Sequence, residues 1–145
     1  MAFTEDSVQL LKDNGYKITG PRIAVLNVLS KAHTPLSAYD IEGQIPENIP
    51  TNVVTVYRVL DIFEKLGIAH RIHTKEGFVR CDFELRHGCH FFAVCDQCGR
   101  THEFLHDDPC LLKKIIPKNL PFKNLKHITE ISGICQSCSL SVNIK

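Results

Sequence analysis

Residues 52–67 read NVVTVYRVLDIFEKLG, and this stretch decides how the first half of the chain folds. Its apolar side chains recur at intervals of three and four residues, which places them on one helical face: Val53, Val56, Leu60 and Phe63. The opposite face is more polar and carries Val54, Thr55, Arg58, Asp61 and Lys65, with Tyr57 at its edge. The pattern predicts an amphipathic helix that runs from Asn52 to Leu66 and is ended by Gly67.

Three shorter helices are predicted before this one. Thr4 is expected to cap the first helix, which stops at Asn14. Pro21 stands near the first position of the second helix. Ser37 and Asp40 have the spacing of a capping box at the start of the third.

A hairpin is predicted after the long helix, because residues 70–73 and 78–81 alternate between apolar and polar side chains. This order of elements is that of a winged helix-turn-helix, which we place at residues 1–83. In such modules the recognition helix offers side chains to base edges in the major groove of DNA. A helical domain whose polar face is merely solvated is the alternative that the pattern leaves open.

Composition and charge limit the classes of partner. The net charge is +1, and residues 1–82 carry nine Lys and Arg against ten Asp and Glu, so bulk charge gives no support to nucleic-acid binding. No run approaches the ~18 apolar residues of a membrane span. Residues 1–6 lack the basic start and apolar run of a secretory signal. We therefore expect a cytoplasmic protein with no membrane partner.

Residues 84–145 are expected to form a second, small α/β domain. All seven cysteines fall between Cys81 and Cys138, and this shift in composition places a boundary near residues 82–88. The elements predicted there are strands and one helix that Pro117 ends or kinks: strands 91–94, 100–104 and 127–131, and helix 111–120. The fold class expected for the whole chain is therefore α+β.

Two Cys-x-x-Cys pairs predict a zinc site in this domain, formed by Cys95, Cys98, Cys135 and Cys138. The cytosol keeps thiols reduced, which favours metal ligation over a disulfide framework. Four thiolates complete a tetrahedron and leave no open position for catalysis, so the predicted role is structural. Gly99 and Gly133, which lie beside the pairs, are expected to supply the unusual backbone angles of these turns.

A second group of potential metal ligands gathers around the predicted boundary. Its members are His70, Cys81, His87, Cys89, His90, His102 and Glu103. They offer imidazole, thiolate and carboxylate groups, all of which zinc accepts. A metal bound there would bridge the two domains, so that its occupancy would act as a switch. For each single histidine, a satisfied surface or core position is the alternative.

Several motifs follow one another in the order seen in the ferric uptake regulator family, which the chain resembles over nearly its whole length. The motifs are Pro21-Arg22, Ser37-Ala38, Thr55-Val56-Tyr57-Arg58-Val59-Leu60, Gly67-Ile68, Cys95-x-x-Cys98-Gly99 and Gly133-Ile134-Cys135-x-x-Cys138. The resemblance implies a homodimeric, metal-activated repressor with a winged helix that binds double-stranded DNA and a C-terminal dimerisation domain. The pattern is most similar to the zinc uptake regulators, which implies repression of zinc-uptake genes.

The resemblance also implies a sensing site, carried over to His70, Cys81, His90 and Glu103, with His87 as the alternative to His90. It therefore implies about two Zn²⁺ per chain, one structural and one regulatory. Residues 87–92 space their histidines unlike most relatives, so Cys89 is a competing ligand. For a further, variable metal site of the family, the available residues are His33, His102 and His127.

For DNA, the resemblance implies Tyr57 and Arg58 as the principal contacts. An outward arginine can be bidentate to guanine, which is worth about 1–3 kcal/mol of discrimination. Thr55 and Asn52 near the helix start are further candidates, and Arg22 is a candidate phosphate contact. Packing is the alternative for Tyr57, and a solvated cap position is the alternative for Arg22.

Other functions remain as alternatives. The nearest is an iron- or peroxide-responsive regulator of the same family, against which the thiol of Cys81 argues. A zinc-dependent nucleobase deaminase would need a His-x-Glu and a Pro-Cys-x-x-Cys motif, and neither occurs. A thiol oxidoreductase would need one reactive cysteine pair near a βαβ start, rather than two pairs at opposite ends of a module.

Overall fold

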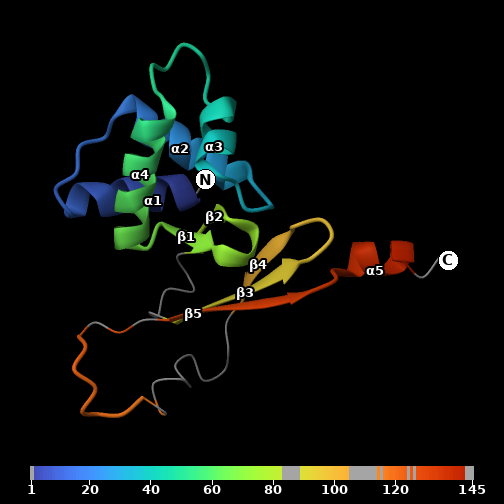
Figure 1. Cartoon of the computed structure of the whole chain (residues 1–145). Helices are drawn as coiled ribbons and strands as arrows, with labels where there is room; N and C mark the ends of the chain where they lie inside the picture. Colours follow the sequence, from blue (N-terminus) through green and yellow to red (C-terminus); the bar gives the residue numbers. More distant parts are fainter. Residues whose placement is uncertain are drawn as a thin grey trace. The chain divides into compact units, whose positions relative to one another are not determined.

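The computed structural model of the protein describes residues 2–82, 89–104, 114, 116–123, 125 and 127–142. The chain divides into two compact units, Met1–Phe83 and Glu84–Lys145 (Figure 1). Within the described residues, no helix combines the length and the apolar character needed to cross a membrane. Each unit has its own sheet, and we describe them in turn.

The first unit contains four helices, of which the last three begin at a side-chain cap. The helices are α1 (Ala2–Asp13), α2 (Gly20–Lys31), α3 (Ala38–Gln44) and α4 (Val53–Leu66). Thr19 Oγ1 accepts the N–H of Arg22 at the start of α2. Ser37 and Asp40 form the predicted capping box at the start of α3, with both of its hydrogen bonds present. These contacts satisfy N–H groups that have no acceptor within the helix.

α1 starts earlier than the sequence predicts. Thr4 is not its cap, because the helix already begins at Ala2, and Phe3 in the first turn is buried in the core. Burial of a phenylalanine contributes roughly 1.5–3 kcal/mol, more than the roughly 1 kcal/mol of a threonine cap. The predicted stop is confirmed, since the helix ends at Asp13 and Gly15 follows with a left-handed φ of 81°.

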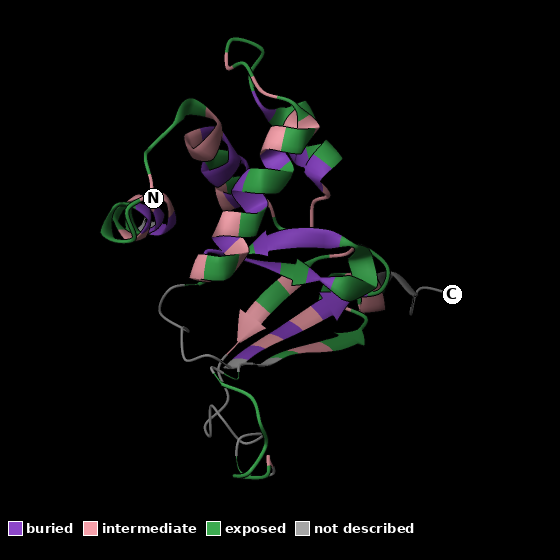
Figure 2. Ribbon diagram, turned by 60° about the vertical axis from the view of Figure 1, so that its left-hand side comes forward, coloured by how far each residue is buried: buried purple, intermediate pink, exposed green. Residues whose placement is uncertain are grey.

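The apolar face of α4 lies at the centre of the first unit's core, as the spacing predicts. The α4 residues with no exposed surface are Val56, Leu60 and Phe63. Val25 and Leu29 of α2 are equally buried and belong to the same cluster. Figure 2 shows buried and exposed segments alternating along these helices. Gly67 ends α4 in the left-handed conformation, with a φ of 73°.

The predicted hairpin follows α4. Its elements are β1 (Ala69–Ile72), the short helix η1 (His73–Lys75) and β2 (Gly77–Arg80), and the two strands are antiparallel. A bridge between Leu36 and Phe78 ties β2 to the segment before α3. Gly77 is required at this contact, because a Cβ there would lie 2.8 Å from the backbone carbonyl carbon of Pro35.

The second unit is built on a sheet with the strand order β4-β3-β5. Its elements are β3 (Cys89–Cys95), β4 (Thr101–Phe104), β5 (His127–Gly133) and α5 (Gln136–Val142). The central strand β3 is antiparallel to β4 and parallel to β5. The parallel register places Cys95 opposite Gly133, where both strands end. The predicted α+β class is confirmed.

Two expectations for the second unit have different outcomes. The segment 111–120 was expected to include a helix that Pro117 ends or kinks; residues 111–113 and 115 lie outside the described part, and Lys114 is in a 3-10 turn. Residues 116–120 form bends and turns, which fits the ring and missing N–H of Pro117. α5 was not predicted, because its sequence QSCSLSV has no apolar stripe of helical period.

Candidate metal centres and nucleic-acid interface

Four cysteines of the second unit meet where β3 and β5 end: Cys95, Cys98, Cys135 and Cys138. Cys95 is the last residue of β3, and Cys98 lies in the turn toward β4. Cys135 directly precedes α5, which contains Cys138. Because β3 and β5 run parallel, they deliver the two pairs to the same end of the sheet. All four sulfur atoms lie within 4.8 Å of one another.

The sulfur spacing fits a tetrahedral zinc ion. The Sγ atoms of Cys98 and Cys135 are 3.7 Å apart. A tetrahedron with Zn–S bonds of about 2.3 Å has sulfur–sulfur edges of about 3.8 Å. A disulfide would need about 2.05 Å, and none of the four cysteines is in a disulfide. The donors therefore suit zinc in both kind and spacing.

Backbone N–H groups point at the sulfur of Cys95. The N–H groups of Cys135 and Cys98 donate to Cys95 Sγ over 3.3 and 3.5 Å, and they lower the pKa of this thiol to about 6. The pKa of Cys138 is raised to about 12, first by its hydrogen bond with the Cys135 side chain and next by burial. The cluster thus stabilises the thiolate of Cys95 and disfavours the loss of a proton from Cys138. A bound cation would favour the thiolate form of all four cysteines.

The two glycines beside the cysteine pairs behave differently. Gly99 has the expected left-handed backbone, with a φ of 77°. Its N–H donates to the carbonyl of Cys95 over 2.9 Å and closes the first turn. The expectation for Gly133 is wrong, because its φ is not positive. Gly133 still belongs to β5 and pairs with β3, so its backbone is extended.

In the first unit, the hairpin holds an imidazole beside a thiol. His70 lies in β1 opposite Val79, and Cys81 follows β2 directly. The N–H of Cys81 donates to the carbonyl of Ile68 over 2.8 Å, which extends the pairing by one step. A ring nitrogen of His70 and Cys81 Sγ lie within 4.8 Å of each other, and both residues are buried. The hairpin therefore holds together two side chains of kinds that can bind a metal ion.

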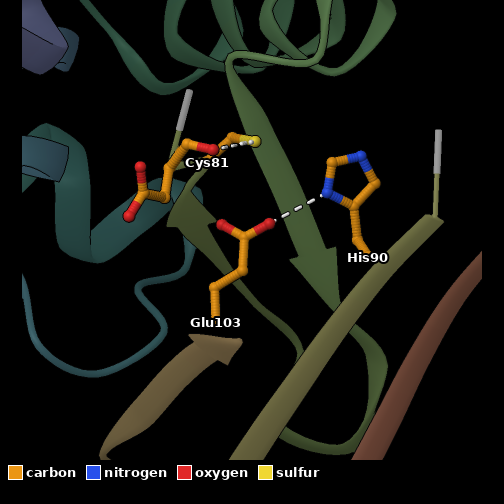
Figure 3. Close-up of polar contacts among 4 residues, drawn as sticks. Cys81, His90 and Glu103 are labelled. Carbon is orange, nitrogen blue, oxygen red and sulfur yellow. Dashed lines mark hydrogen bonds and ion pairs between the residues drawn. The ribbon is translucent and has the colours of Figure 1, made fainter. Parts of the chain in front are cut away.

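In the second unit, β3 and β4 hold an imidazole against a carboxylate. His90 Nδ1 lies 2.9 Å from Glu103 Oε2, and both side chains are buried (Figure 3). Glu103 stands opposite Phe92 in the strand register, and the His90 ring stacks on the Phe92 ring with a centroid distance of 6.5 Å. Figure 3 also shows the Cys81 thiol of the other unit donating to the Asp82 carbonyl over 3.6 Å.

The remaining predicted metal ligands take no part in these arrangements as far as the structure describes them. His87 lies outside the described residues, and so do the side chains of Cys89 and His127. His33 follows α2 and His102 lies in β4. Among the described residues, neither of these two histidines belongs to a group of potential ligands.

The exposed face of α4 carries several of the predicted DNA contacts. Arg58 is exposed, and Tyr57 is 41% exposed. The Tyr57 ring meets the Tyr39 ring edge-on, with a centroid distance of 6.4 Å. Asn52 is the cap of α4, since its Oδ1 accepts the N–H of Thr55 over 2.9 Å. The side chain of Thr55 is half-buried.

Arg22 makes two contacts within its own unit. Its Nη1 donates to the carbonyl of Lys17 over 2.6 Å. Its guanidinium also lies over the Tyr16 ring, 5.5 Å from the centroid. A planar guanidinium can make both contacts at once, so Arg22 ties the connection between α1 and α2 to the start of α2.

The whole-chain comparison decides the family. The model of the ferric uptake regulator family matches residues 13–132. The chain belongs to the ferric uptake regulator family. A ferric uptake regulation protein of Neisseria gonorrhoeae is 34% identical, over 91% of this chain and 92% of its own. A peroxide-responsive repressor, PerR, of Staphylococcus saprophyticus is 30% identical, over 92% of this chain and 90% of its own.

A solved structure shares the fold of this ferric uptake regulator family member. It is a zinc uptake regulator complexed with zinc and DNA, with a TM-score of 0.82 and 23% identity, covering 98% of this chain and 95% of its own. The family consists of dimeric DNA-binding regulators, so the chain is a metalloregulator and not an enzyme. The deaminase and thiol oxidoreductase alternatives are therefore excluded. The relatives include both a ferric uptake regulation protein and a peroxide-responsive repressor, so the comparisons do not decide which metal this chain binds. That question depends on the chemistry of the ligands.

Sequence reasoning missed two aromatic residues that lie against predicted DNA contacts. Tyr39 is 66% exposed and touches Tyr57, and Tyr16 lies beneath Arg22. The sequence does contain a signal for Tyr39. It lies between Ser37 and Asp40, the two residues of the capping box, so it stands in the first turn of a helix, where capping rather than packing selects the residues. No comparable signal marks Tyr16, because what distinguishes it is its contact with the guanidinium of Arg22, which lies six positions later in the chain.

Proposed function

We propose that this chain is a cytoplasmic, zinc-responsive transcriptional repressor of zinc-uptake genes. In this proposal, the four cysteines of the second unit hold a structural zinc. A regulatory zinc is bound by four further residues, two from each unit: His70, Cys81, His90 and Glu103. The homodimer binds its operator when the regulatory zinc is in place.

The observation that carries the proposal is the buried thiol of Cys81 beside His70. A thiolate is a soft ligand, which suits zinc better than the harder nitrogen and oxygen sets that serve ferrous iron or manganese. Both residues are held in place by the hairpin. Binding a metal would therefore require little further ordering of these two side chains, and the entropy cost of binding would be small. The hydrogen bond between Cys81 N–H and Ile68 holds the thiol at this position.

Each unit supplies half of a four-ligand set. His70 and Cys81 offer nitrogen and sulfur, while His90 and Glu103 offer nitrogen and oxygen. A tetrahedral zinc that takes all four would fix one arrangement of the two units. Moving such a switch from mostly off to mostly on takes about 5.5 kcal/mol of differential binding. Two regulatory zincs per dimer would each need to supply roughly half of it.

The DNA-binding part of the proposal rests on α4. Its exposed face offers Arg58 and Tyr57, and a helix of this kind fits the major groove. Dimerisation is assigned to residues 84–145. In support, β5 is an edge strand of the described sheet, and its Ile128 and Ile131 are 42% and 50% exposed. An apolar edge strand of this kind needs a cover, which a second copy would supply.

The proposal is tested by Cys81→Ser, with Cys89→Ser as a matched control. The probe is a duplex that the zinc-loaded protein selects from a random pool. Cys81→Ser is expected to remain a folded dimer but to lose about 100-fold in zinc-dependent affinity, because only about 1% of it would adopt the competent arrangement without metal. Cys89→Ser is expected to keep the response. An unchanged zinc response of Cys81→Ser would reject the regulatory site.

Metal identity is tested separately. The purified protein is expected to contain one zinc per chain that survives mild chelation and a second that is removed. The chelated protein is then reloaded with zinc, ferrous iron or manganese, and affinity for the selected duplex is measured. Zinc is expected to restore binding at the lowest free concentration, and restoration by iron at a lower concentration would identify an iron regulator instead.

A further inference from the structure

Val54 is an apolar side chain on the exposed face of α4. It is 55% exposed, whereas Val56 and Val59 of the same helix are 0% and 4% exposed. The core that α4 helps to form therefore does not explain why position 54 is apolar.

Helix stability does not explain Val54 either. A β-branched residue loses χ1 freedom in a helix and is several tenths of a kcal/mol less favourable than alanine. Position 54 is the second residue of α4, where an acidic residue would interact favourably with the helix dipole. A sequence selected only for a stable helix would carry alanine, glutamate or aspartate here.

The surroundings of Val54 combine apolar and cationic groups. Tyr57 and Arg58 follow three and four positions later, so they are its neighbours on the helix surface. Tyr57 is also supported from the side by Tyr39, with ring centroids 6.4 Å apart. The valine thus lies beside an exposed aromatic ring and one turn before an exposed guanidinium.

One chemical group of DNA matches this surface. In the major groove, the base edges present hydrogen-bond donors and acceptors, and the only apolar group among them is the C5-methyl of thymine. Arg58 suits the O6 and N7 acceptors of guanine. Residues one turn apart are separated by about 6 Å along a helix, and successive bases by about 3.4 Å. The two side chains would therefore address bases about two steps apart.

We propose that Val54 reads the C5-methyl group of a thymine, and that Tyr57 provides the second apolar surface around it. This inference rests on the proposed function, because it requires α4 to enter the major groove of an operator. Each half-site then contains a thymine about two base steps from the guanine that Arg58 contacts. Val54 contributes sequence preference, while phosphate contacts contribute affinity.

The test uses the full-length, zinc-loaded dimer and the duplex that it selects from a random pool. Each thymine of a half-site is replaced in turn by deoxyuridine, which pairs in the same way but lacks the methyl group. For the natural protein, one such replacement is expected to weaken binding about 4-fold, the effect of removing one buried methyl group. Val54→Ala is expected to bind the thymine duplex more weakly and to show no further loss with deoxyuridine at that position.

Val54→Ile is the conservative control and is expected to keep the preference for thymine. Alanine and isoleucine are both compatible with a helix, so neither variant is expected to unfold the unit. Equal effects of deoxyuridine on the natural protein and on Val54→Ala would overturn this inference but not the proposed function. An unchanged affinity of Val54→Ala for the thymine duplex would do the same, and would point to a protein partner for this surface. Failure of the zinc-loaded protein to select any duplex would overturn the proposed function as well.

Discussion

At the scale of single residues, the internal contacts of Arg22 offer a second role for it beside the predicted phosphate contact. Sequence position makes it a candidate phosphate contact. In the structure its guanidinium is engaged by the Lys17 carbonyl and the Tyr16 ring. A residue held in this way would affect DNA binding through the connection that it holds, whereas a phosphate contact would act through its charge.

Arg22→Lys separates these two roles, because it keeps the charge and loses the planar group. If Arg22 acts by position, Arg22→Lys and Arg22→Gln are both expected to weaken binding of the selected duplex by roughly 1 kcal/mol, about 5-fold, through the lost hydrogen bond and ring contact. The slope of log affinity against log salt is expected to stay unchanged. A slope smaller by about 1.8 in Arg22→Gln, which is about 0.9 for each of the two Arg22 side chains of the dimer, with near-normal binding by Arg22→Lys, would instead identify a phosphate contact.

At the scale of elements, two glycines allow a paired test of how the hairpin is held. A Cβ on Gly77 would lie 2.8 Å from Pro35 backbone, whereas a Cβ on Gly43 in α3 would meet nothing within 4 Å. Gly77→Ala is therefore expected to destabilise the first unit by roughly 1–3 kcal/mol. Gly43→Ala is expected to stabilise it by up to about 1 kcal/mol, through helix propensity.

The measurement is the melting temperature of the zinc-loaded protein by far-ultraviolet circular dichroism. For a unit of this size, 1 kcal/mol corresponds to a shift of roughly 4–8 °C. Opposite signs for the two variants are expected. A lower melting temperature for both would show that the contact with Pro35 is not what distinguishes Gly77.

The elements that the sequence predicts well are those whose signals are local. α4 has an apolar face of helical period and Gly67 at its end, and the hairpin has two short segments rich in apolar residues joined by a turn, so both follow from short-range rules. α5 has no such signal, because its sequence QSCSLSV has no apolar stripe of helical period. The start of α1 was missed because burial of Phe3, a tertiary contact, outweighs the local cap.

The candidate metal centres could be predicted only in part, for a related reason. Paired cysteines have a spacing that reports their chemistry directly, as Cys95 and Cys98 do. The pairing of His90 with Glu103 depends on the register of β3 with β4, which no short motif encodes. Resemblance to a family supplied what spacing could not, and Tyr39, which lies outside the motifs of that resemblance, was missed.

At the scale of the whole molecule, the two proposed zincs are expected to differ in what their removal does. A mild chelator is expected to take the regulatory zinc and leave both units folded. A strong chelator under acidic conditions is expected to take the structural zinc too and to unfold the second unit, because four uncompensated thiol groups remain where the sheet ends. Circular dichroism and metal analysis, recorded together during the titration, follow both events.

Cys98→Ser is the matched variant for this experiment. It removes one of the four sulfur ligands and is expected to destabilise the second unit while the helices of the first unit keep their signal. Loss of both zincs in one step from the natural protein would contradict the distinction between structural and regulatory metal. So would a normally stable second unit in Cys98→Ser.

The parallel pairing of β3 with β5 has a consequence for how the chain is made. Cys135 lies 40 positions after Cys95, so the ends of a long segment must be gathered before the four sulfurs can meet, and this costs closure entropy. A ribosome adds about 5–20 residues per second. The helices and hairpin of the first unit, which depend on nearer neighbours in the chain, therefore have seconds to form before the last cysteine is synthesised. If the four cysteines hold zinc as proposed, insertion of that metal is a late step of maturation, and zinc shortage is expected to leave chains whose N-terminal unit is complete and whose C-terminal unit is not.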